Sequence, residues 1–530
     1  MTPWGSGGVL EGPQDLEDLA TAGWLSETLF ATLELGVFEA LGEGALPLPE
    51  LARRCGADPE AFARLARALS ALGLLSLWEG RAACTAVARR HLLPESPDYL
   101  GHSLAYRRRL ARTWTSLADA VRRGGSPISP PEEEDPEAYR ARVAAYVRAM
   151  DDVARHKGAL LAGRIELARL GTGTILDLGG GAGALAAALV RRYPGWTAVV
   201  ADLPEVVEAA RELWARREGG VPEGLSFLGT DLLAAPLPRP PDDDGEGWTA
   251  ILASNVVHAY GPAEAEALLR RAAEGLSERG VLVLHDFWTD GPGRGPVKSA
   301  LFDLHMLVHT YQGRTYPWRW ARELLEGMGL ATLGPVPVGS HPGEEDTDLV
   351  VGARRAPALQ AVRVGRLEQL DGQARALGLT ETRPLAPEAV VTAPWVGEKC
   401  RFGCAGYGKG NQCPPRSPAL ADTRATLASY RSALLVRGEP PTAEFHRRML
   451  ALERAAFLSG APRALALVAG PCRLCPECAP GACARPELAR PSLEACGVDV
   501  YATAEKVGWP LTPVARPDGP AHYLGLLLVE

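Results

Sequence analysis

Residues 175–183 read Ile-Leu-Asp-Leu-Gly-Gly-Gly-Ala-Gly, and an apolar helical pattern from Ala184 to Val190 follows at once. A buried apolar run that enters a glycine-rich turn and then a helix brings backbone N–H groups close to a ligand. A second apolar run, residues 198–201, ends in Asp202, where a carboxylate can accept both hydroxyls of a ribose. This stretch predicts the start of a nucleotide-binding βαβ unit.

Further apolar runs predict the rest of one sheet. Strands are expected near 173–179, 197–203, 225–231, 248–255 and 281–287, with a closing pair near 331–338 and 348–353. Helical segments alternate with them, which indicates a mainly parallel, doubly wound α/β sheet. The glycine pattern alone fits NAD almost as well. Asp177 inside the turn and Asp231 after the third strand resemble instead the S-adenosylmethionine site of methyltransferases, where no pyrophosphate would be repelled.

Bulk composition limits the classes of protein to which the chain can belong. Its 530 residues allow two to four domains. The net charge of −8 argues against general attraction to nucleic acid or to anionic membranes. No apolar run is long enough to cross a bilayer, and no export signal is evident. We therefore expect a cytoplasmic protein.

The first 120 residues are expected to be largely helical. Asp58 is placed to cap a helix from Glu60 to about Leu74, and residues 75–78 and 83–85 predict a hairpin around Glu79 and Gly80. This order is typical of a winged helix, which serves either DNA binding or dimerisation. The second helix carries Arg64 and Arg67 but is otherwise mostly alanine and leucine, which favours dimerisation.

The chain is expected to contain three domains. A winged-helix dimerisation domain is expected over residues 1–123, followed by a proline- and acid-rich connector at 124–135. A Rossmann-like domain is expected over 136–356, opening with a helix from Pro136 to about Leu170. A cysteine-rich α+β domain is expected over 359–530.

From about residue 12 to 355 the chain resembles small-molecule O-methyltransferases of the caffeate, hydroxyindole and polyketide type. The resemblance rests on the winged-helix front and on four motifs in order: residues 177–183, 202–204, 229–231 and 254–258. It implies S-adenosylmethionine as cofactor and a small-molecule substrate. It also implies a homodimer formed through the first domain.

The same resemblance implies roles for individual residues. Gly179, Gly181 and Gly183 would lie under the cofactor, Asp202 on its ribose and Asp231 at its adenine amino group, with Leu232 or Leu233 against the ring. His258 aligns with the family's general base. Family members usually follow this histidine with Asp-Trp, whereas here Ala259 and Tyr260 follow. Asp286, at the end of the strand 281–287, is therefore the expected partner of His258.

A later helix supplies candidate substrate-lining residues. His305, Met306 and His309 lie in the family's substrate-lining region, and Met150 and Tyr311 are candidates on the same basis. His305 and His309 share a helix face. A metal pair is the alternative to pocket lining, but no third ligand is evident.

Eight of the ten cysteines lie between Cys400 and Cys496. In a cytoplasmic chain such clustering indicates metal ligation. One group is Cys472, Cys475, Cys478 and Cys483; the other is Cys400, Cys404 and Cys413, with Cys496 as a hypothetical fourth ligand. The tight spacing of the first group favours [4Fe–4S] clusters, and structural zinc is the alternative.

Residues 360–530 resemble a family of cysteine-rich predicted metal-binding proteins of unassigned function. The matching landmarks lie at residues 399–404, 407–408, 413–415, 470–472 and 490–495. The resemblance indicates the type of domain and not its reaction.

Three functions are compatible with these features. The first is O-methylation of a small aromatic or polyketide-like molecule with His258 as base, with an electron donor left open as a partner of the tail. The second is methylation of a metal, metalloid or thiol presented by the cysteines, for which His258 would be dispensable. The third is a redox-responsive winged-helix regulator, which would leave His258 and its pocket unexplained.

Overall fold

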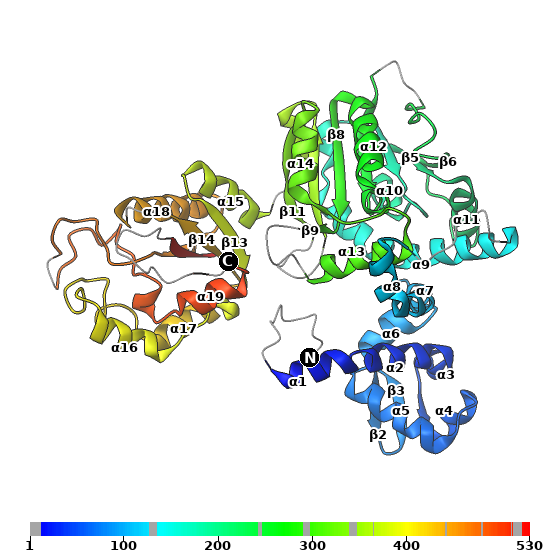
Figure 1. Cartoon of the computed structure of the whole chain (residues 1–530), viewed down its shortest axis with the longest axis horizontal. Coiled ribbons are helices and arrows are strands. Elements are labelled where there is room, and N and C mark those ends of the chain that lie inside the picture. The colour runs from blue at the N-terminus through cyan, green and yellow to red at the C-terminus, as the bar shows by residue number, and fades with distance from the viewer. Residues whose placement is uncertain are drawn as a thin grey trace. The chain divides into compact units, whose positions relative to one another are not determined.

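The computed structural model describes residues 12–126, 135–241, 246–289, 297–338, 347–363, 365–439, 442–478, 481–509, 511 and 522–529. The chain divides into two compact units: residues 1–339 with 345–363, and residues 340–344 with 364–530. Figure 1 colours the first from blue to green and the second from yellow to red. Within the described residues, no helix combines the length and apolar character needed to cross a bilayer.

The first unit opens with a winged helix. A three-stranded antiparallel sheet in the order β1-β3-β2 packs beside short helices. Asp58 caps α5 by accepting the backbone N–H of Ala61 at 2.8 Å, as the sequence predicts. The elements are α1 (Pro13–Thr21), α2 (Gly23–Glu34), α3 (Val37–Leu41), β1 (Ala45–Pro47), α4 (Leu48–Arg54), α5 (Pro59–Ala71), β2 (Leu75–Trp78), β3 (Arg81–Cys84) and α6 (Ala86–Leu92).

Four helical segments connect the winged helix to the large sheet: α7 (Gly101–Ala111), η1 (Arg112–Ser116), α8 (Leu117–Arg123) and α9 (Pro136–Arg164). The expectation that α9 continues to about Leu170 is wrong. At Ile165 the backbone turns extended and pairs with Val362, and a separate short helix, η3 (Leu167–Leu170), follows.

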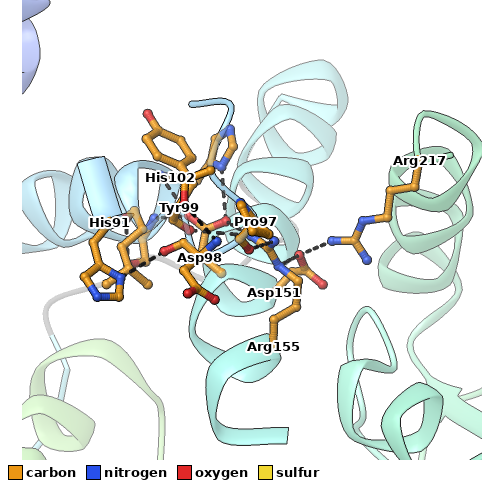
Figure 2. A network of polar contacts seen from close by, with 12 residues as sticks. His91, Pro97, Asp98, Tyr99, His102, Asp151, Arg155 and Arg217 are labelled. Carbon is orange, nitrogen blue, oxygen red and sulfur yellow. Dashed lines mark hydrogen bonds and ion pairs between the residues drawn. The ribbon is translucent and has the colours of Figure 1, made fainter. Parts of the chain in front are cut away.

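Two adjacent aspartates of α9, Asp151 and Asp152, join it to its neighbours, and Figure 2 shows Asp151 between Arg155 and Arg217. Asp152 accepts the backbone N–H groups of His102 and Ser103 at 2.9 and 3.1 Å, which satisfies donors at the N-terminus of α7. Asp151 forms ion pairs with Arg217 and with Arg155. Burial raises the pKa of Asp151, although both guanidinium groups oppose the shift. This contact therefore pairs one buried carboxylate with two partly exposed guanidinium groups.

The central sheet has seven strands in the order β11-β12-β8-β7-β4-β5-β6. The five strands from β8 to β6 are parallel, and β12 pairs antiparallel with both β8 and β11. This confirms the mainly parallel, doubly wound sheet. The strands are β4 (Thr174–Leu178), β5 (Thr197–Asp202), β6 (Leu225–Gly229), β7 (Trp248–Ser254), β8 (Leu276–Asp286), β11 (Ala331–Pro337) and β12 (Asp348–Ala353).

Helices cover both faces of this sheet. Ile175 of β4 packs in one apolar core with residues of α10, while Leu176 and Leu178 pack in a second core with residues of α12 and α14. The carboxyl ends of the parallel strands meet at one edge, where ligands bind in such sheets. The remaining elements are α10 (Ala184–Arg192), α11 (Pro204–Ala215), η4 (Val257–Ala259), α12 (Pro262–Glu274), β9 (Trp288–Thr289), α13 (Val297–His309), β10 (Tyr316–Pro317), α14 (Trp318–Gly327) and η5 (Ala356–Ala361).

The second unit is an α+β domain, as the sequence predicts. Its four strands form an antiparallel sheet in the order β13-β14-β16-β15, with one apolar core on each face. The elements are α15 (Arg366–Ala376), β13 (Glu381–Leu385), η6 (Pro387–Ala389), α16 (Pro394–Gly403), α17 (Leu420–Ala428), β14 (Ser432–Gly438), α18 (Thr442–Leu458), β15 (Leu465–Leu467), η7 (Glu494–Cys496), α19 (Val500–Lys506) and β16 (Tyr523–Val529).

Candidate active site and cysteine-rich site

The glycine turn after β4 adopts backbone angles that favour glycine. Gly179 and Gly183 have φ of 62° and 72°, in the left-handed region. A Cβ on Gly179 would lie 2.5 Å from a side-chain carbon of Val256, so a larger residue cannot fit there without movement. Gly183 directly precedes the first residue of α10. The turn therefore keeps bare backbone at the carboxyl edge of the sheet.

Asp202 is fixed against this turn. Its Oδ2 accepts the backbone N–H of Gly181 at 2.9 Å, and its Oδ1 accepts that of Leu203 at 2.8 Å. Burial raises the pKa of Asp202, while the two backbone donors lower it. The carboxylate is thus held at the end of β5, facing the glycine loop.

Asp177 lies beneath the loop and is 1% exposed. Burial, and then the neighbouring Asp202 carboxylate, raise the pKa of Asp177 to about 7. A hydrogen bond from the backbone N–H of Ala186 acts in the opposite direction and lowers it. Its Oδ1 has no hydrogen-bond partner among the described residues. Two crowded acidic groups at this edge favour a cationic ligand.

Asp231 and Leu232 follow the next strand, β6. Asp231 Oδ1 accepts the backbone N–H groups of Leu233 and Ala234, and Leu232 is buried. The backbone N–H of Thr230 donates to the carbonyl of Asp202 at 2.8 Å. The acidic residues after β5 and β6 therefore stand at neighbouring strand ends.

His258 and Asp286 form a buried pair. His258 Nδ1 lies 2.5 Å from Asp286 Oδ1, and the backbone N–H of His258 donates to Asp286 Oδ2 at 3.3 Å. Asp286 is 2% exposed. Because the carboxylate engages Nδ1, Nε2 is the nitrogen of His258 left to exchange a proton with a ligand.

An aromatic row extends from this pair. Phe302 packs edge-on against His258 with centroids 4.8 Å apart, and stacks on Phe287 at 4.2 Å and on His305 at 5.7 Å. His305 Nδ1 accepts the indole N–H of Trp114 at 3.3 Å. We call Trp114, Phe287, Phe302 and His305 the aromatic row. The sequence analysis missed its three members other than His305, because nothing in their local patterns marks them.

His305 and His309 do share a face, with ring centroids 4.1 Å apart. Burial, then His309, Arg107 and His258, lower the pKa of His305 to about 4, so its ring is neutral near neutral pH. His309 Nδ1 contacts the carbonyl of His305 at 3.0 Å. No group of three potential metal ligands occurs among the described residues, which leaves the metal-pair alternative without support.

The other predicted substrate-lining residues differ in their exposure. Met306 is buried in α13, Met150 is half-buried in α9, and Tyr311 is 56% exposed. The sequence also missed His285, a buried neighbour of Asp286 that contacts Ser254 Oγ at 2.8 Å. Burial lowers the pKa of His285 to about 3.

In the second unit, Cys400 lies in α16, Cys404 and Cys413 lie on the loop that follows, and the Cys472 group lies on a neighbouring loop. One cavity is lined by Cys472, Cys475, Cys478 and Cys483 together with Asn411 and Gln412 of the other loop. Asn411 Nδ2 donates to Cys478 Sγ at 3.7 Å, and Asn411 Oδ1 accepts the backbone N–H of Gly481 at 3.0 Å. Asn411, which the sequence analysis missed, therefore bridges the loops.

The cysteines of the two groups lie close enough to change one another's pKa. Burial raises the pKa of Cys413, and Cys404, Cys400, Cys478 and Cys472 raise it further. Iron–sulfur clusters and structural zinc are bound by thiolates, so the chemical type of these side chains suits a metal centre. As placed, however, no three such side chains converge on one point within the described part of the chain.

Cys496 is placed differently from the sequence hypothesis. Its side chain is buried in the apolar core with Leu493, Val498 and Trp509. Burial raises the pKa of Cys496 to about 12, and Thr423 and Glu494 are the other groups that act on it. The hypothesis that Cys496 completes the Cys400 group stays a prediction, and in this structure its side chain packs in the core instead of lining the cavity of the other cysteines.

Comparison with known proteins decides the family. Residues 17–93 match the family described as O-methyltransferase dimerisation domain, residues 114–331 the O-methyltransferase domain, and residues 383–529 the predicted metal-binding protein (DUF2284). The 3-hydroxy-5-methyl-1-naphthoate 3-O-methyltransferase of Streptomyces sahachiroi is 32% identical over 327 residues, covering 61% of this chain and 91% of that protein.

The chain belongs to the small-molecule O-methyltransferase family.

Other relatives agree with this. The acetylserotonin O-methyltransferase of Bos taurus is 34% identical over 334 residues, covering 60% of this O-methyltransferase and 93% of the bovine protein. The crystal structure of human N-acetylserotonin methyltransferase in complex with SAM superposes with a TM-score of 0.56 at 27% identity. It covers 65% of this chain and 99% of the human chain.

Family membership fixes the class of reaction and the methyl donor. This O-methyltransferase depends on S-adenosylmethionine and acts on small molecules. It combines a dimerisation domain with a C-terminal domain of a predicted metal-binding type.

Proposed function

We propose that this enzyme methylates the hydroxyl of a small aromatic or polyketide-like molecule, with His258 as general base. The observation that carries the proposal is the 2.5 Å contact between His258 Nδ1 and Asp286 Oδ1. The carboxylate orients the ring so that Nε2 accepts the hydroxyl proton, and it stabilises the imidazolium that forms. A buried, oriented imidazole suits a phenol, whose proton must leave as the methyl group arrives.

Besides removing the proton, the protein must position the acceptor oxygen relative to the methyl group. S-adenosylmethionine, when bound, supplies a methyl group already activated on a sulfonium. The chain must therefore mainly hold the acceptor oxygen in line with that group and exclude water. Phe302, which packs against His258, and the rest of the aromatic row offer flat surface for an aromatic acceptor. The relative from Streptomyces sahachiroi is named for a hydroxylated naphthoate, which agrees with this class.

We assign the cofactor to the edge where β4, β5 and β6 end. Gly179, Gly181 and Gly183 let the backbone lie under it; Asp202 would hold the ribose, Asp231 the adenine amino group, and Leu232 the ring. The bond from the N–H of Gly181 to Asp202 supports this assignment, because it fixes the carboxylate beside the glycine loop. Because burial raises the pKa of Asp177 to about 7, a cationic ligand bound beside it would favour the ionised form of this carboxyl.

We further propose a homodimer formed through the N-terminal domain. Its first two helices expose large apolar side chains: Leu16 is 59% exposed, Leu19 45% and Trp24 73%. Such residues on adjacent helices α1 and α2 are suited to a partner surface. The match to a dimerisation domain over residues 17–93 supports the same assignment.

For the second unit we propose one or more [4Fe–4S] clusters, with zinc as the alternative. Cys472, Cys475 and Cys478 have the spacing that holds one face of a cubane, and Cys483 lines the same cavity. Cys400, Cys404 and Cys413 would form a second group. Such thiols persist in the cytoplasm, where we place the enzyme, and an electron donor would be a natural partner.

The testing experiment compares His258→Ala with His522→Ala, an exposed control. Methyl transfer to a panel of phenols and naphthols is measured, together with binding of S-adenosylhomocysteine. We expect His258→Ala to lose about 10²–10⁴-fold in kcat, with binding retained. Methyl transfer that survives in His258→Ala would reject the hydroxyl acceptor in favour of a thiol or metal acceptor, which needs no base.

A further inference from the structure

The end of β7 is bound to β8 through a side-chain contact as well as through the backbone. Ser254, the last residue of β7, pairs in register with His285, and Ser254 Oγ lies 2.8 Å from His285 Nδ1. The backbone N–H of Asn255 donates to the carbonyl of His285 at 2.8 Å. His285 therefore fixes the point at which the chain leaves β7, through its ring and through its carbonyl.

The residue that follows Ser254 adopts a strained conformation. Asn255 has φ of 53°, in the left-handed region that residues other than glycine rarely adopt. Such a conformation persists only where the surrounding structure holds it in place. The contacts of His285 on both sides of the peptide bond between Ser254 and Asn255 do so, and His258 follows in η4.

The turn of residues 254–258 contacts both the glycine turn and the end of β8. A side-chain carbon of Val256 lies where a Cβ on Gly179 would be only 2.5 Å away. At the other end of the turn, Asp286 accepts the backbone N–H of His258 and contacts its ring. A shift of the turn at Ser254 would therefore move His258 relative to the glycine turn.

Packing alone does not explain a histidine at position 285. Side chains of a strand alternate between its faces, and Val281 and Val283, on the same face as His285, belong to an apolar core. His285 is 1% exposed, and its Nε2 has no hydrogen-bond partner among the described residues. Burial lowers the pKa of His285 to about 3, so the ring is neutral. An apolar side chain would avoid the cost of the unpaired nitrogen, so the contact with Ser254 is what the imidazole adds.

We propose that His285, through its hydrogen bond with Ser254, is a positioning residue for His258. The inference rests on the proposal that His258 is the general base. His285 fixes the start of the turn that carries His258, whereas Asp286 fixes the ring of His258. Neither nitrogen of His285 takes part in the proton transfer. Because methyl transfer requires an aligned acceptor, a misplacement of about 1 Å can slow it about 100-fold.

The test measures methyl transfer to a naphthol by the full-length enzyme, together with the affinity for S-adenosylhomocysteine and the melting temperature. His285→Leu and Ser254→Ala each remove the hydrogen bond and should lower kcat about 10–100-fold, with the affinity for S-adenosylhomocysteine unchanged. The double variant should lose no more than either single variant, because both remove the same bond. His285→Asn keeps a polar atom close to the position of Nδ1 and should recover most of the lost activity.

A second acceptor separates proton transfer from other roles of His285. A nitro-substituted naphthol that is already ionised at the assay pH needs no general base, so His285→Leu should reach nearly the wild-type kcat with it. An equal loss with both acceptors would show that His285 serves the fold in general and would overturn the assignment. A fall in the affinity for S-adenosylhomocysteine large enough to account for the lost activity would overturn it as well.

His446→Leu is the matched control. His446 is also fully buried, with Nε2 at 3.0 Å from the carbonyl of Leu488 and with Nδ1 lacking a partner among the described residues. It lies in the second unit, in α18, so its replacement should leave kcat at the wild-type value. A loss of kcat in His446→Leu equal to that in His285→Leu would contradict a specific role of His285.

His258→Ala, measured alongside, keeps the two proposals apart. Full methyl transfer by His258→Ala would reject the general base, and His285 would then have nothing to position. Loss of methyl transfer in His258→Ala, with kcat retained in folded His285→Leu and Ser254→Ala, would reject the positioning role alone. If His285→Leu does not fold, Ser254→Ala decides, because it removes a single oxygen atom.

Discussion

His258 Nδ1 lies 2.5 Å from Asp286 Oδ1, although the two residues are 28 positions apart in the chain. The parallel strands β7 and β8 are neighbours in the sheet and produce this contact. Ser254 of β7 pairs with His285 of β8, so the two strands end at the same edge of the sheet. The ring orientation of His258 is therefore set by the end of the adjacent strand rather than by the residues that follow it.

Asp286→Asn should lower kcat by about 10²–10⁴-fold, because an amide cannot hold the imidazole in the same tautomer or stabilise its charged form. Steady-state kinetics with a naphthol acceptor checks this. Asp286 also accepts the backbone N–H of Phe287 at 2.8 Å, so melting temperature is measured in parallel. Lower stability with unchanged kcat would show that Asp286 acts only in the fold.

Phe302→Leu should raise KM for an aromatic acceptor by about 2–10-fold, which corresponds to the loss of about 0.5–1.5 kcal/mol of ring packing. Binding of S-adenosylhomocysteine should not change. Phe402→Leu is the matched control, since Phe402 is 78% exposed in the second unit. An unchanged KM in Phe302→Leu would remove the aromatic row from the acceptor site.

Asp177 should make the cofactor-free protein less stable as pH rises. Its folded pKa of about 7 lies above its unfolded value near 3.8, so the folded state binds more protons between these values. The free energy of unfolding of wild type relative to Asp177→Asn should therefore fall from about pH 4 to about pH 7 and then level. Urea unfolding at several pH values measures it, and a constant difference would contradict the burial of an ionisable carboxyl.

Asp152→Ala should reduce the free energy of unfolding by about 1–3 kcal/mol, because two backbone N–H groups at the start of α7 lose their acceptor. Urea unfolding followed by circular dichroism measures the change. Asp119→Ala provides the control: its pair with Arg122 is exposed, so its effect should stay within about 0.5 kcal/mol. Equal effects of the two substitutions would contradict the role of Asp152.

Asn411→Ala should weaken metal binding by the second unit about 10–100-fold, because it removes both the donor to Cys478 and the acceptor for Gly481. Competition with a chelator measures the affinity. Gln412→Ala, which alters the same cavity wall, should have a smaller effect. An equal loss of metal affinity in the two variants would contradict a role for the hydrogen bonds of Asn411.

Much of the fold was predictable from local pattern. The apolar runs that lead to Asp177, Asp202 and Asp231 predicted three neighbouring parallel strands. The runs of β4 and β5 are mostly buried, whereas β6, at the edge of the sheet, is mostly exposed. Asp58 marked the start of α5 because a cap acts within one helical turn. Boundaries set by distant pairing were missed: α9 ends at Arg164 because Ile165 pairs with Val362.

The candidate site was predictable only in part. The glycine turn and the acidic strand ends are close in sequence to the strands that position them. Trp114, Phe287 and Phe302 are far apart in the chain, and only the packing of α13 against η1 and the end of β8 brings them into one row. Asn411 has no spacing signal, because it belongs to no cysteine motif.

By itself the sequence determined the order of the elements, the glycine turn with its acidic neighbours, and the presence of a thiol-rich second half. These depend on periodicity and spacing, which operate over a few residues. Only the tertiary structure decided that Asp286 contacts His258, that Phe302 packs against that ring, and that the Cys496 side chain lies in the apolar core. Side-chain direction at a strand end or in a one-turn helix depends on which distant elements pack there, and no local pattern encodes that.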